Sequence, residues 1–514
     1  MSKTIIIIGA GLAGLSAALQ AAENGCNVKL VSSFPSERAQ SVMAEGGINA
    51  ALNTKDENDS PEEHFTDTIK AACGLADPNA VWGMTQAAPE LVHWLLKLGV
   101  QFNMSGYDDV DLRNFGGQKK KRTAFAQSDT GKQIMTAMID AVRRKEASGM
   151  VERFSHHSFL TLRLCDNICC GCVIRDEYSQ EIVELPGDAV IVASGGMHGL
   201  FGNTTGSLSN TGEVTAELFR LGVPLANGEM IQYHPTTVEC GGKRMLISEA
   251  ARGEGGRLFA MKDGKQWYFM EEKYPELGNL MPRDITAREI WKVSHESEVF
   301  LDMTEISDEI ISNKLSGLAD DCMTYLHKDI RKEPVSVLPG IHYFMGGILV
   351  DEQHRTSIQN LYAAGECCAQ YHGANRLGGN SLLGALYGGR VAAKSACEQA
   401  DVVELSCATQ IDVPPASQIS EIKQLNKVMQ ETMGVVRNEN TLLNGIRTVQ
   451  TLTGNLPLLG MAVLKSALAR KESRGAHWRE DYPEYNNRDF LKTTVARFDG
   501  KQIQISFMSV PERR

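Results

Sequence analysis

The chain opens with an apolar run that changes from strand-like to helix-like spacing. Residues 4–8 read Thr-Ile-Ile-Ile-Ile, and residues 9–22 carry three glycines followed by an alanine-rich stretch. β-Branched residues favour a strand, whereas apolar residues spaced three and four apart favour a helix. Further apolar strands are expected at 27–31, 189–192 and 361–363. This alternation predicts an α/β fold.

Apolar positions at helical spacing predict the main helices. Ser60 and Glu63 form a capping box before a helix over 61–72, because each side chain can satisfy a free backbone N–H. Residues 78–99 continue with the same periodicity. Later helices are expected at 284–292 and 308–326, and residues 372–383 lead into another that ends at about residue 398. The last helices are expected at 420–435, 441–450 and 459–472.

The density of glycine turns divides the chain into domains. Such turns become rare between 233 and 342, where charged helices appear, and the strand-and-turn pattern then returns. Pro414 and Pro415 indicate a linker before the last helices. The expected domains are a discontinuous first domain (1–229 and 343–410), an inserted domain (230–342) and a C-terminal helical domain with a polar tail (416–514).

Composition and charge are those of an ordinary globular protein. The 514 residues are 42% hydrophobic and 22% charged, with a net charge of −11, which argues against nucleic-acid binding. The only apolar stretch near membrane-spanning length, 4–22, is explained by the strand, turn and helix, so no direct membrane span is expected. Because no basic leader precedes it, we expect a cytoplasmic or cytoplasm-facing protein.

Two unusual clusters receive structural interpretations. Cys165, Cys169, Cys170 and Cys172 lack a second C-x-x-C pair, so they predict a half-buried strand and turn, with an iron or zinc site as the alternative. The 12 cysteines are expected to be reduced and mostly buried. Residues 119–122, Lys-Lys-Lys-Arg, predict a solvated loop, with a wall of an anion pocket or a partner contact as the alternative.

A glycine motif directly follows the first strand. Gly9, Gly11 and Gly14 form G-x-G-x-x-G, in which the first glycine permits the turn, the second lets a pyrophosphate approach and the third lets the helix pack closely. The helix N-terminus then offers free N–H groups to phosphates. We therefore predict a dinucleotide site. Ser32 replaces the acidic residue expected after the second strand, so NAD specificity does not follow.

A second group of residues suggests an anion pocket. Ser248, Glu249 and Arg252 bring a hydroxyl, a carboxylate and a guanidinium within five residues. The other members are His234, Arg283, His342 and Arg376. If they converge, their charge exceeds what a protein gathers without an anion, which predicts a small dianion such as a dicarboxylate. The alternative is a set of scattered surface salt bridges.

Ordered motifs then give the chain a resemblance. They are the N-terminal glycine motif and residues 233–236, 248–256, 283–284, 342–347, 372–382 and 473–483. Over nearly its whole length the chain resembles the flavoprotein subunit of the fumarate reductase and succinate dehydrogenase family. The resemblance implies a Rossmann-like FAD-binding domain, an inserted α+β capping domain that binds substrate and a C-terminal helical domain.

The resemblance also implies roles for individual positions. The expected FAD contacts are Gly9, Gly11, Gly14, Ser32, Ser41, Ala44, Gly46, Gly47, Glu213, Glu366, Ser381 and Leu382. The carboxylates of fumarate or succinate would be held by His234, Ser248, His342 and Arg376. Arg283 would donate the proton that accompanies hydride transfer from the flavin, with Glu249 and Arg252 as its proton path. No metal site is implied within the chain.

Three positions depart from the family pattern. Gln40 stands where most membrane-bound members have a His that carries the flavin covalently, so we expect noncovalent FAD. Loss of that link would lower the flavin potential, which disfavours succinate oxidation more than fumarate reduction. Glu45 stands where Gln is usual, and an anionic Glu45 would lower the potential further. Glu213 stands where Asp is usual.

The family resemblance extends to partners and to one alternative enzyme. The chain lacks an iron–sulfur cysteine pattern, so a separate iron–sulfur subunit is implied, possibly with a membrane anchor on the inner face of a membrane, and 479–482 is a candidate contact. L-aspartate oxidase is the alternative, although it usually shows Ala-Ser-Asn where Gly378-Gly379-Asn380 stand here. A flavin-containing tRNA-modifying protein is disfavoured by the acidic charge.

Overall fold

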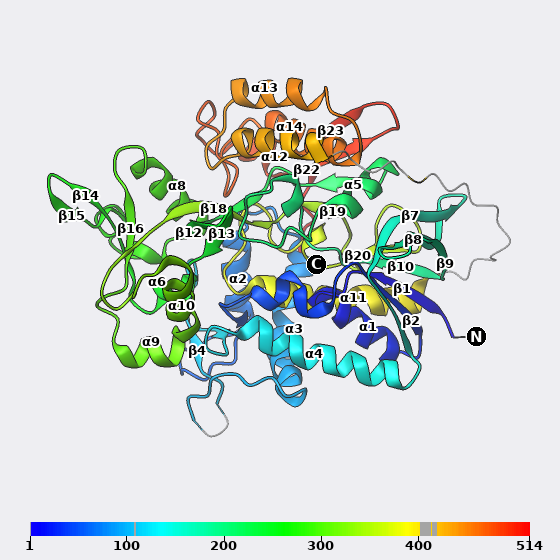
Figure 1. Cartoon of the computed structure of the whole chain (residues 1–514), viewed down its shortest axis with the longest axis horizontal. Helices are drawn as coiled ribbons and strands as arrows, with labels where there is room; N and C mark the ends of the chain where they lie inside the picture. The colour runs from blue at the N-terminus through cyan, green and yellow to red at the C-terminus, as the bar shows by residue number, and fades with distance from the viewer. Residues whose placement is uncertain (1, 107–108, 401–412, 414–418) are drawn as a thin grey trace.

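The computed structural model describes residues 2–106, 109–400, 413 and 419–514. A five-stranded sheet with the order β20-β10-β1-β2-β6 lies near the N-terminus of the chain, and its neighbouring strands are all parallel (Figure 1). The strands are β1 (Thr4–Ile8), β2 (Asn27–Ser32), β6 (Val151–Ser155), β10 (Ala189–Val192) and β20 (Leu361–Ala363). Segments from both sides of residues 230–342 therefore share one sheet.

Helices cover one face of this sheet and an antiparallel sheet covers the other. The helices are α1 (Leu12–Glu23), α3 (Pro78–Lys97), α4 (Thr130–Ala147) and α11 (Asn380–Gln399), and the second sheet is β7 (His157–Cys165), β8 (Ile168–Asp176) and β9 (Ile182–Pro186). The predicted cap of α2 (Pro61–Ala71) is confirmed, because the Ser60 hydroxyl accepts a hydrogen bond from the Glu63 N–H at 3.2 Å.

The cysteine cluster lies in the β7–β8 hairpin, which confirms the predicted strand and turn. Cys169, Cys170 and Cys172 are buried free thiols there. Cys165 is disulfide-bonded, so the expectation of reduced thiols is wrong at that position. Within the described ranges, no three His, Cys, Asp or Glu side chains are arranged to hold a metal ion.

The basic run at 119–122 is only partly solvated. Lys119 and Lys121 are exposed, but Arg122 is fully buried between Asp59 and Asp67, whose carboxylates lie 2.9 and 3.0 Å from its guanidinium. The prediction of a solvated loop is therefore wrong at Arg122, because a buried cation needs paired carboxylates.

Two antiparallel sheets and short helices follow β11 (Leu225–Ala226) and precede β19 (Gly347–Leu349). The first sheet is β12 (Ile231–Cys240), β13 (Lys243–Leu246) and β18 (Leu338–Phe344), and the second is β14 (Arg257–Lys262), β15 (Lys265–Trp267), β16 (Val299–Asp302) and β17 (Val335–Ser336). The accompanying helices are α6 (Glu249–Gly253), α7 (Phe269–Lys273), α8 (Arg283–Val293), α9 (Asp308–Lys314) and α10 (Ser316–Asp321). The helix predicted at 284–292 is confirmed as α8.

The single helix predicted at 308–326 is wrong. Leu315 separates α9 from α10, with a φ of −128° that lies outside the helical range. Its side chain is buried in the local core, so tertiary packing overrides the helical periodicity of the sequence.

The C-terminal part combines helices with a hairpin. The helices α12 (Ile419–Thr432), α13 (Glu439–Val449) and α14 (Asn455–Ala469) pack on one core, as expected. The expected polar tail instead contains β22 (Lys492–Phe498) and β23 (Ile503–Ser509), and β22 pairs with β11. The linker predicted at Pro414 and Pro415 lies outside the described residues. The domain boundaries stay predictions, and the one at 342 falls within β18.

No helix in the described part of the chain has the length and apolar character that crossing a membrane requires.

Candidate functional site

One cavity of about 1130 Å³ is lined by both groups of predicted site residues. From the dinucleotide group these are Gly9, Gly11, Ser32, Ser41, Ala44, Gly46, Gly47, Glu213, Glu366, Ser381 and Leu382, and from the anion group His234, Ser248, Glu249, Arg283, His342 and Arg376. Gly14 and Arg252 are not in the wall. The residues predicted from distant parts of the chain therefore converge, and the alternative of scattered surface salt bridges is wrong.

The glycine turn has the shape that a pyrophosphate requires. Gly9 has a φ of +111°, and a Cβ there would lie 2.2 Å from the Ala193 carbonyl oxygen. A Cβ at Gly14 would lie 1.9 Å from the Gly9 carbonyl oxygen, which confirms close helix packing and explains why Gly14 is behind the wall. The turn opens onto the cavity at Gly11, directly before the N-terminus of α1.

An unpaired hydroxyl adds to the fit with a dinucleotide. The Ser32 hydroxyl at the end of β2 is buried and has no hydrogen-bond partner among the described residues. A buried polar group without a partner is costly, and a ribose hydroxyl would satisfy it. Ser381 and Leu382 bring the N-terminal turn of α11 to the same cavity. These residues fit FAD.

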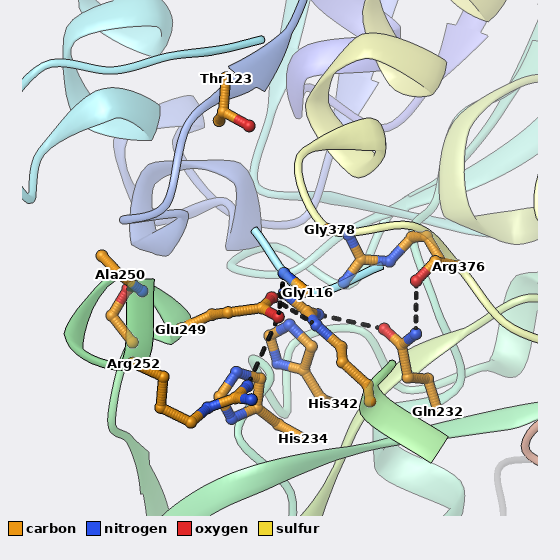
Figure 2. A network of polar contacts seen from close by, with 12 residues as sticks. Gly116, Thr123, Gln232, His234, Glu249, Ala250, Arg252, His342, Arg376 and Gly378 are labelled. Carbon is orange, nitrogen blue, oxygen red and sulfur yellow. Dashed lines mark hydrogen bonds and ion pairs between the residues drawn. The ribbon is translucent and has the colours of Figure 1, made fainter. Parts of the chain in front are cut away.

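The anion group is centred on the carboxylate of Glu249 (Figure 2). Its Oε2 accepts hydrogen bonds from Arg283 Nε at 2.8 Å and Nη2 at 2.5 Å. Its Oε1 accepts one from the Gly116 N–H at 3.1 Å and lies 3.4 Å from Arg252 Nη2. Burial alone would raise the pKa of Glu249, but Arg283 and Arg252 hold it below its ordinary value. Glu249 is therefore ionised at neutral pH.

Local helix starts place these three charged side chains. Ser248 caps α6, accepting a hydrogen bond from the Ala250 N–H at 3.4 Å, and Glu249 and Arg252 then lie three positions apart on one face. Pro282 precedes Arg283, the first residue of α8. Because Pro is restricted to extended or helix-starting backbone, it fixes where this helix begins.

The two histidines face each other from neighbouring strands. His234 on β12 and His342 on β18 have ring centroids 5.1 Å apart, and Thr205 Oγ1 lies 2.8 Å from His342 Nδ1. Burial, and then the nearby Arg283, lower the pKa of both rings well below the ordinary value. Both histidines are therefore neutral at pH 7 and can act as hydrogen-bond donors without adding charge.

Arg376 is held over the ring of Tyr343, with its guanidinium carbon 4.4 Å from the ring centroid. Its Nε is buried and has no hydrogen-bond partner in the described part of the chain. Burial, and then the charge of Arg283, lower the pKa of Arg376 to about 9, so it is still charged at pH 7. An unpaired buried guanidinium in a cavity wall can donate charged hydrogen bonds to an anion.

The charges of this group do not cancel. Arg252, Arg283 and Arg376 supply three positive charges and Glu249 supplies one negative charge, while the histidines are neutral, which leaves two positive charges. Two unbalanced charges in a buried site match a ligand with two negative charges. The geometry thus supports the prediction of a dianion.

Sequence reasoning missed Gln232. It precedes His234 by two positions on β12, is fully buried, and its Oε1 accepts a hydrogen bond from Arg283 Nη1 at 3.1 Å. The alternation of side chains along a strand could have placed it beside His234.

Comparisons with known proteins agree with this arrangement. Residues 4–382 match the family described as FAD binding domain, and residues 452–513 match the family described as fumarate reductase flavoprotein C-term. The chain is 39% identical to the succinate dehydrogenase flavoprotein subunit of Bacillus subtilis, covering 100% of this chain and 98% of that protein. It is 33% identical to L-aspartate oxidase of Pyrococcus furiosus, covering 96% and 99%.

A solved structure extends the likeness to three dimensions. A chain of E. coli quinol fumarate reductase matches with a TM-score of 0.90 and 27% sequence identity, covering 99% of this chain and 97% of that one. The chain belongs to the succinate dehydrogenase and fumarate reductase flavoprotein family. It is thus an FAD-dependent oxidoreductase whose relatives include L-aspartate oxidase.

The protonation state of Glu45 decides whether this residue adds negative charge to the cavity of this flavoprotein. Glu45 is buried in the cavity wall, and burial, followed by repulsion from Asp321, raises its pKa to about 8. At pH 7 its carboxyl is therefore mostly neutral and can donate a hydrogen bond, as the usual Gln would. No added negative charge lowers the flavin potential through Glu45 at that pH.

The side chain of Gln40 is fixed by the protein. Its Oε1 accepts a hydrogen bond from the Ser207 N–H at 2.5 Å in the wall of the cavity.

The candidate partner contact at 479–482 does not include the side chain of Arg479, because that side chain is fully buried and bonded to Asp481. Glu480 and Asp481 are exposed.

The ionisation of Glu45 has a measurable effect on stability. Its pKa is raised from 4.5 to about 8, so the folded state holds the proton more tightly than the unfolded state. The free energy of unfolding then falls between about pH 4.5 and about pH 8, by up to about 1.4 kcal/mol per pH unit. Glu45→Gln cannot ionise, so from about pH 5.5 to about pH 7.5 we expect it to gain about 2 kcal/mol relative to the native protein.

Urea unfolding of the flavin-loaded proteins at the two pH values measures this gain. Glu181→Gln, at an exposed position, is the matched control and should follow the native pH dependence. Parallel pH dependences for Glu45→Gln and the native protein would show that Glu45 is ionised throughout.

Proposed function

We propose that this flavoprotein reduces fumarate to succinate. The observation that carries the proposal is the buried group with two unbalanced positive charges, in the same cavity as the glycine turn that fits FAD. A dicarboxylate matches this charge, and Arg283 supplies a proton donor beside it.

The residues present account for the proton that the reaction needs. Bound FAD, once reduced by an external electron donor, would supply a hydride to one alkene carbon of fumarate. Arg283 would donate a proton to the other carbon, because its guanidinium lies in the cavity wall and is held by Glu249. The Glu249 carboxylate would then take a proton from Arg252 and pass it to the neutral Arg283, and Arg252 would regain a proton from solvent. Because Arg283 is buried, this relay would replace direct exchange of the proton with bulk water.

The remaining polar side chains would stabilise charge in the transition state. When hydride adds to the alkene, negative charge builds on the carboxylate conjugated to the carbon being protonated. Arg376, His234 and His342 are fixed by packing before substrate arrives, and donors placed in advance lower the barrier more than mobile ones. The same donors would orient the substrate.

Gln40 supports reduction as the favoured direction. Its amide is a poor nucleophile and is already engaged by Ser207, so FAD would be held noncovalently. Loss of a covalent link lowers the flavin potential, which favours giving electrons to fumarate over taking them from succinate. The neutral state of Glu45 removes the second reason for a low potential, so the proposed direction rests on Gln40.

The charge of the site argues against L-aspartate as the preferred substrate. Aspartate carries an ammonium group as well as two carboxylates, and the site already has two unbalanced positive charges. The one carboxylate of the group, Glu249, is occupied by Arg283 and Arg252. An ammonium group would therefore be repelled.

We also propose that the chain works with an iron–sulfur subunit, as the name of its relative from Bacillus subtilis, a flavoprotein subunit, suggests. With such a partner alone the chain would be cytoplasmic, and a membrane anchor in the same complex would place it on the inner face of a membrane. The iron–sulfur signal of the complex purified from its natural source should become reduced with the flavin on adding an electron donor. A signal that never changes with the flavin would contradict this.

Oxidation of a reduced dye tests the proposed reaction. With a panel of unsaturated dicarboxylates we expect turnover with fumarate, and with Arg283→Lys a fall of at least about a hundredfold while FAD stays bound, because the lysine cannot keep both contacts to Glu249. Arg143→Lys, in an exposed ion pair with Glu37, is the control. Bleaching of the flavin by aspartate but not by succinate would assign the chain to aspartate oxidation instead.

Acid precipitation tests how FAD is attached. Because Gln40 replaces the nucleophilic His, all of the yellow colour should pass into the supernatant. Gln40→His provides the comparison, since it restores the residue type that forms the link. Flavin that stays on the precipitated native protein would contradict noncovalent binding.

A further inference from the structure

A ring of polar groups lies directly behind Arg283. Arg283 Nη1 donates a hydrogen bond to Gln232 Oε1 at 3.1 Å, and Gln232 Nε2 donates one to Asn375 Oδ1 at 2.9 Å. Asn375 Nδ2 in turn donates to Asp284 Oδ1 at 3.0 Å. Asp284 follows Arg283 in the chain, so the backbone of α8 closes the ring.

The direction of every hydrogen bond in the ring is fixed by its two ends. A guanidinium only donates, so the oxygen of Gln232 must face Arg283 and its nitrogen must face Asn375. The oxygen of Asn375 then faces Gln232, and its nitrogen must face the carboxylate of Asp284. If a donor in the ring were replaced by an acceptor, two acceptors would face each other and the hydrogen bond between them would be lost.

The ring connects the proton donor to the second guanidinium of the site. Gln232 Nε2 also donates to the Arg376 carbonyl oxygen at 2.8 Å (Figure 2). One amide therefore holds Arg283 and the backbone of Arg376 together. Arg283 and Asp284 begin α8, Gln232 lies on β12, and Asn375 belongs to the loop before α11. Three separate segments are thus joined beside the cavity.

We propose that Asp284 is a positioning residue that, through Asn375 and Gln232, sets the separation and orientation of the Arg283 and Arg376 guanidinium groups. This inference rests on the proposed function, in which these two groups bind and protonate a dicarboxylate. Asp284 does not touch the substrate. Its part is to hold the loop that carries Arg376 in register with the helix that carries Arg283.

Burial explains why the ring is strong enough for this role. Gln232 and Asn375 are 0% and 3% exposed, so water does not compete for their hydrogen bonds. Burial raises the pKa of Asp284, while Arg288, one turn further along α8, opposes that rise. The Arg288 guanidinium carbon lies 4.0 Å from the Trp478 ring centroid, which holds it in place.

The loop has other anchors, so variants of the ring can fold. The Ala374 N–H donates to the Ala72 carbonyl at 3.0 Å, and the Ala476 N–H donates to the Ala374 carbonyl at 2.9 Å. These backbone bonds do not involve the side chain of Asn375. The ring therefore determines fine placement in a loop that is already attached.

Exchange of donor and acceptor tests the proposal. Asn375→Asp opposes two carboxylates, and in the flavin-loaded protein we expect malonate, a dicarboxylate that cannot be reduced, to bind at least about tenfold more weakly. Adding Asp284→Asn returns a donor opposite the new carboxylate, so most of the lost affinity should be recovered. Perturbation of the visible flavin spectrum measures malonate binding, and the KM and kcat for fumarate follow in parallel.

Two measurements separate positioning from a purely structural role. A structural role would lower the melting temperature and the flavin content of Asn375→Asp without changing the malonate affinity of the folded fraction. Glu289→Gln, an acid-to-amide change on the same helix but away from the ring, is the matched control and should bind malonate as the native protein does.

Each result decides for or against the ring. Recovery in the double variant supports it, even if Asn375→Asp alone does not fold. The proposal is overturned if Asn375→Asp weakens malonate binding equally whether residue 284 is Asp or Asn. A double variant that fails to fold or to bind malonate also overturns it. Failure of the proposed function has a different signature, in which the native protein neither binds malonate nor reduces fumarate, and that result overturns both.

Discussion

A buried carboxylate shared between two guanidinium groups is the interaction on which the site depends. Glu249 pairs with Arg283 and Arg252, all three side chains are buried, and each of these charges would be costly to bury alone. Because Arg376 has no such partner, the pairing still leaves the positive charge that a dianion would neutralise. The same contacts hold α6 against the start of α8, so stability and ligand binding use the same atoms.

The pairing of β12 with β18 positions the polar side chains next to these charged residues. The two strands carry Gln232, His234 and His342, and the Phe344 N–H at the end of β18 donates a hydrogen bond to Glu366 in the cavity wall at 3.1 Å. Antiparallel strands hold their side chains at fixed spacing, so the two imidazoles face each other without help from the ligand. A site built on strands and helix starts is more rigid than one built on free loops.

Much of the fold was predictable, because buried parallel strands such as β1 and β10 are continuous apolar runs. The break at Leu315 was not, since it depends on burial against distant residues, and β22 was missed because its partner β11 is far away in the chain. The roles of the site residues followed from family resemblance. Their convergence could not be seen in the sequence, and neither could the neutral state of Glu45, which depends on its burial and then on Asp321 lying nearby.

The hairpin at the end of the chain has a consequence for biosynthesis. β11 is only two residues long and lies between β19 and β22 in the order β21-β19-β11-β22-β23, where β21 is Cys368–Ala369. During translation it stays an open edge while more than 250 further residues are made, since β22 begins at Lys492. This sheet therefore closes only when the hairpin has left the ribosome, which makes its assembly a late event in the maturation of the protein.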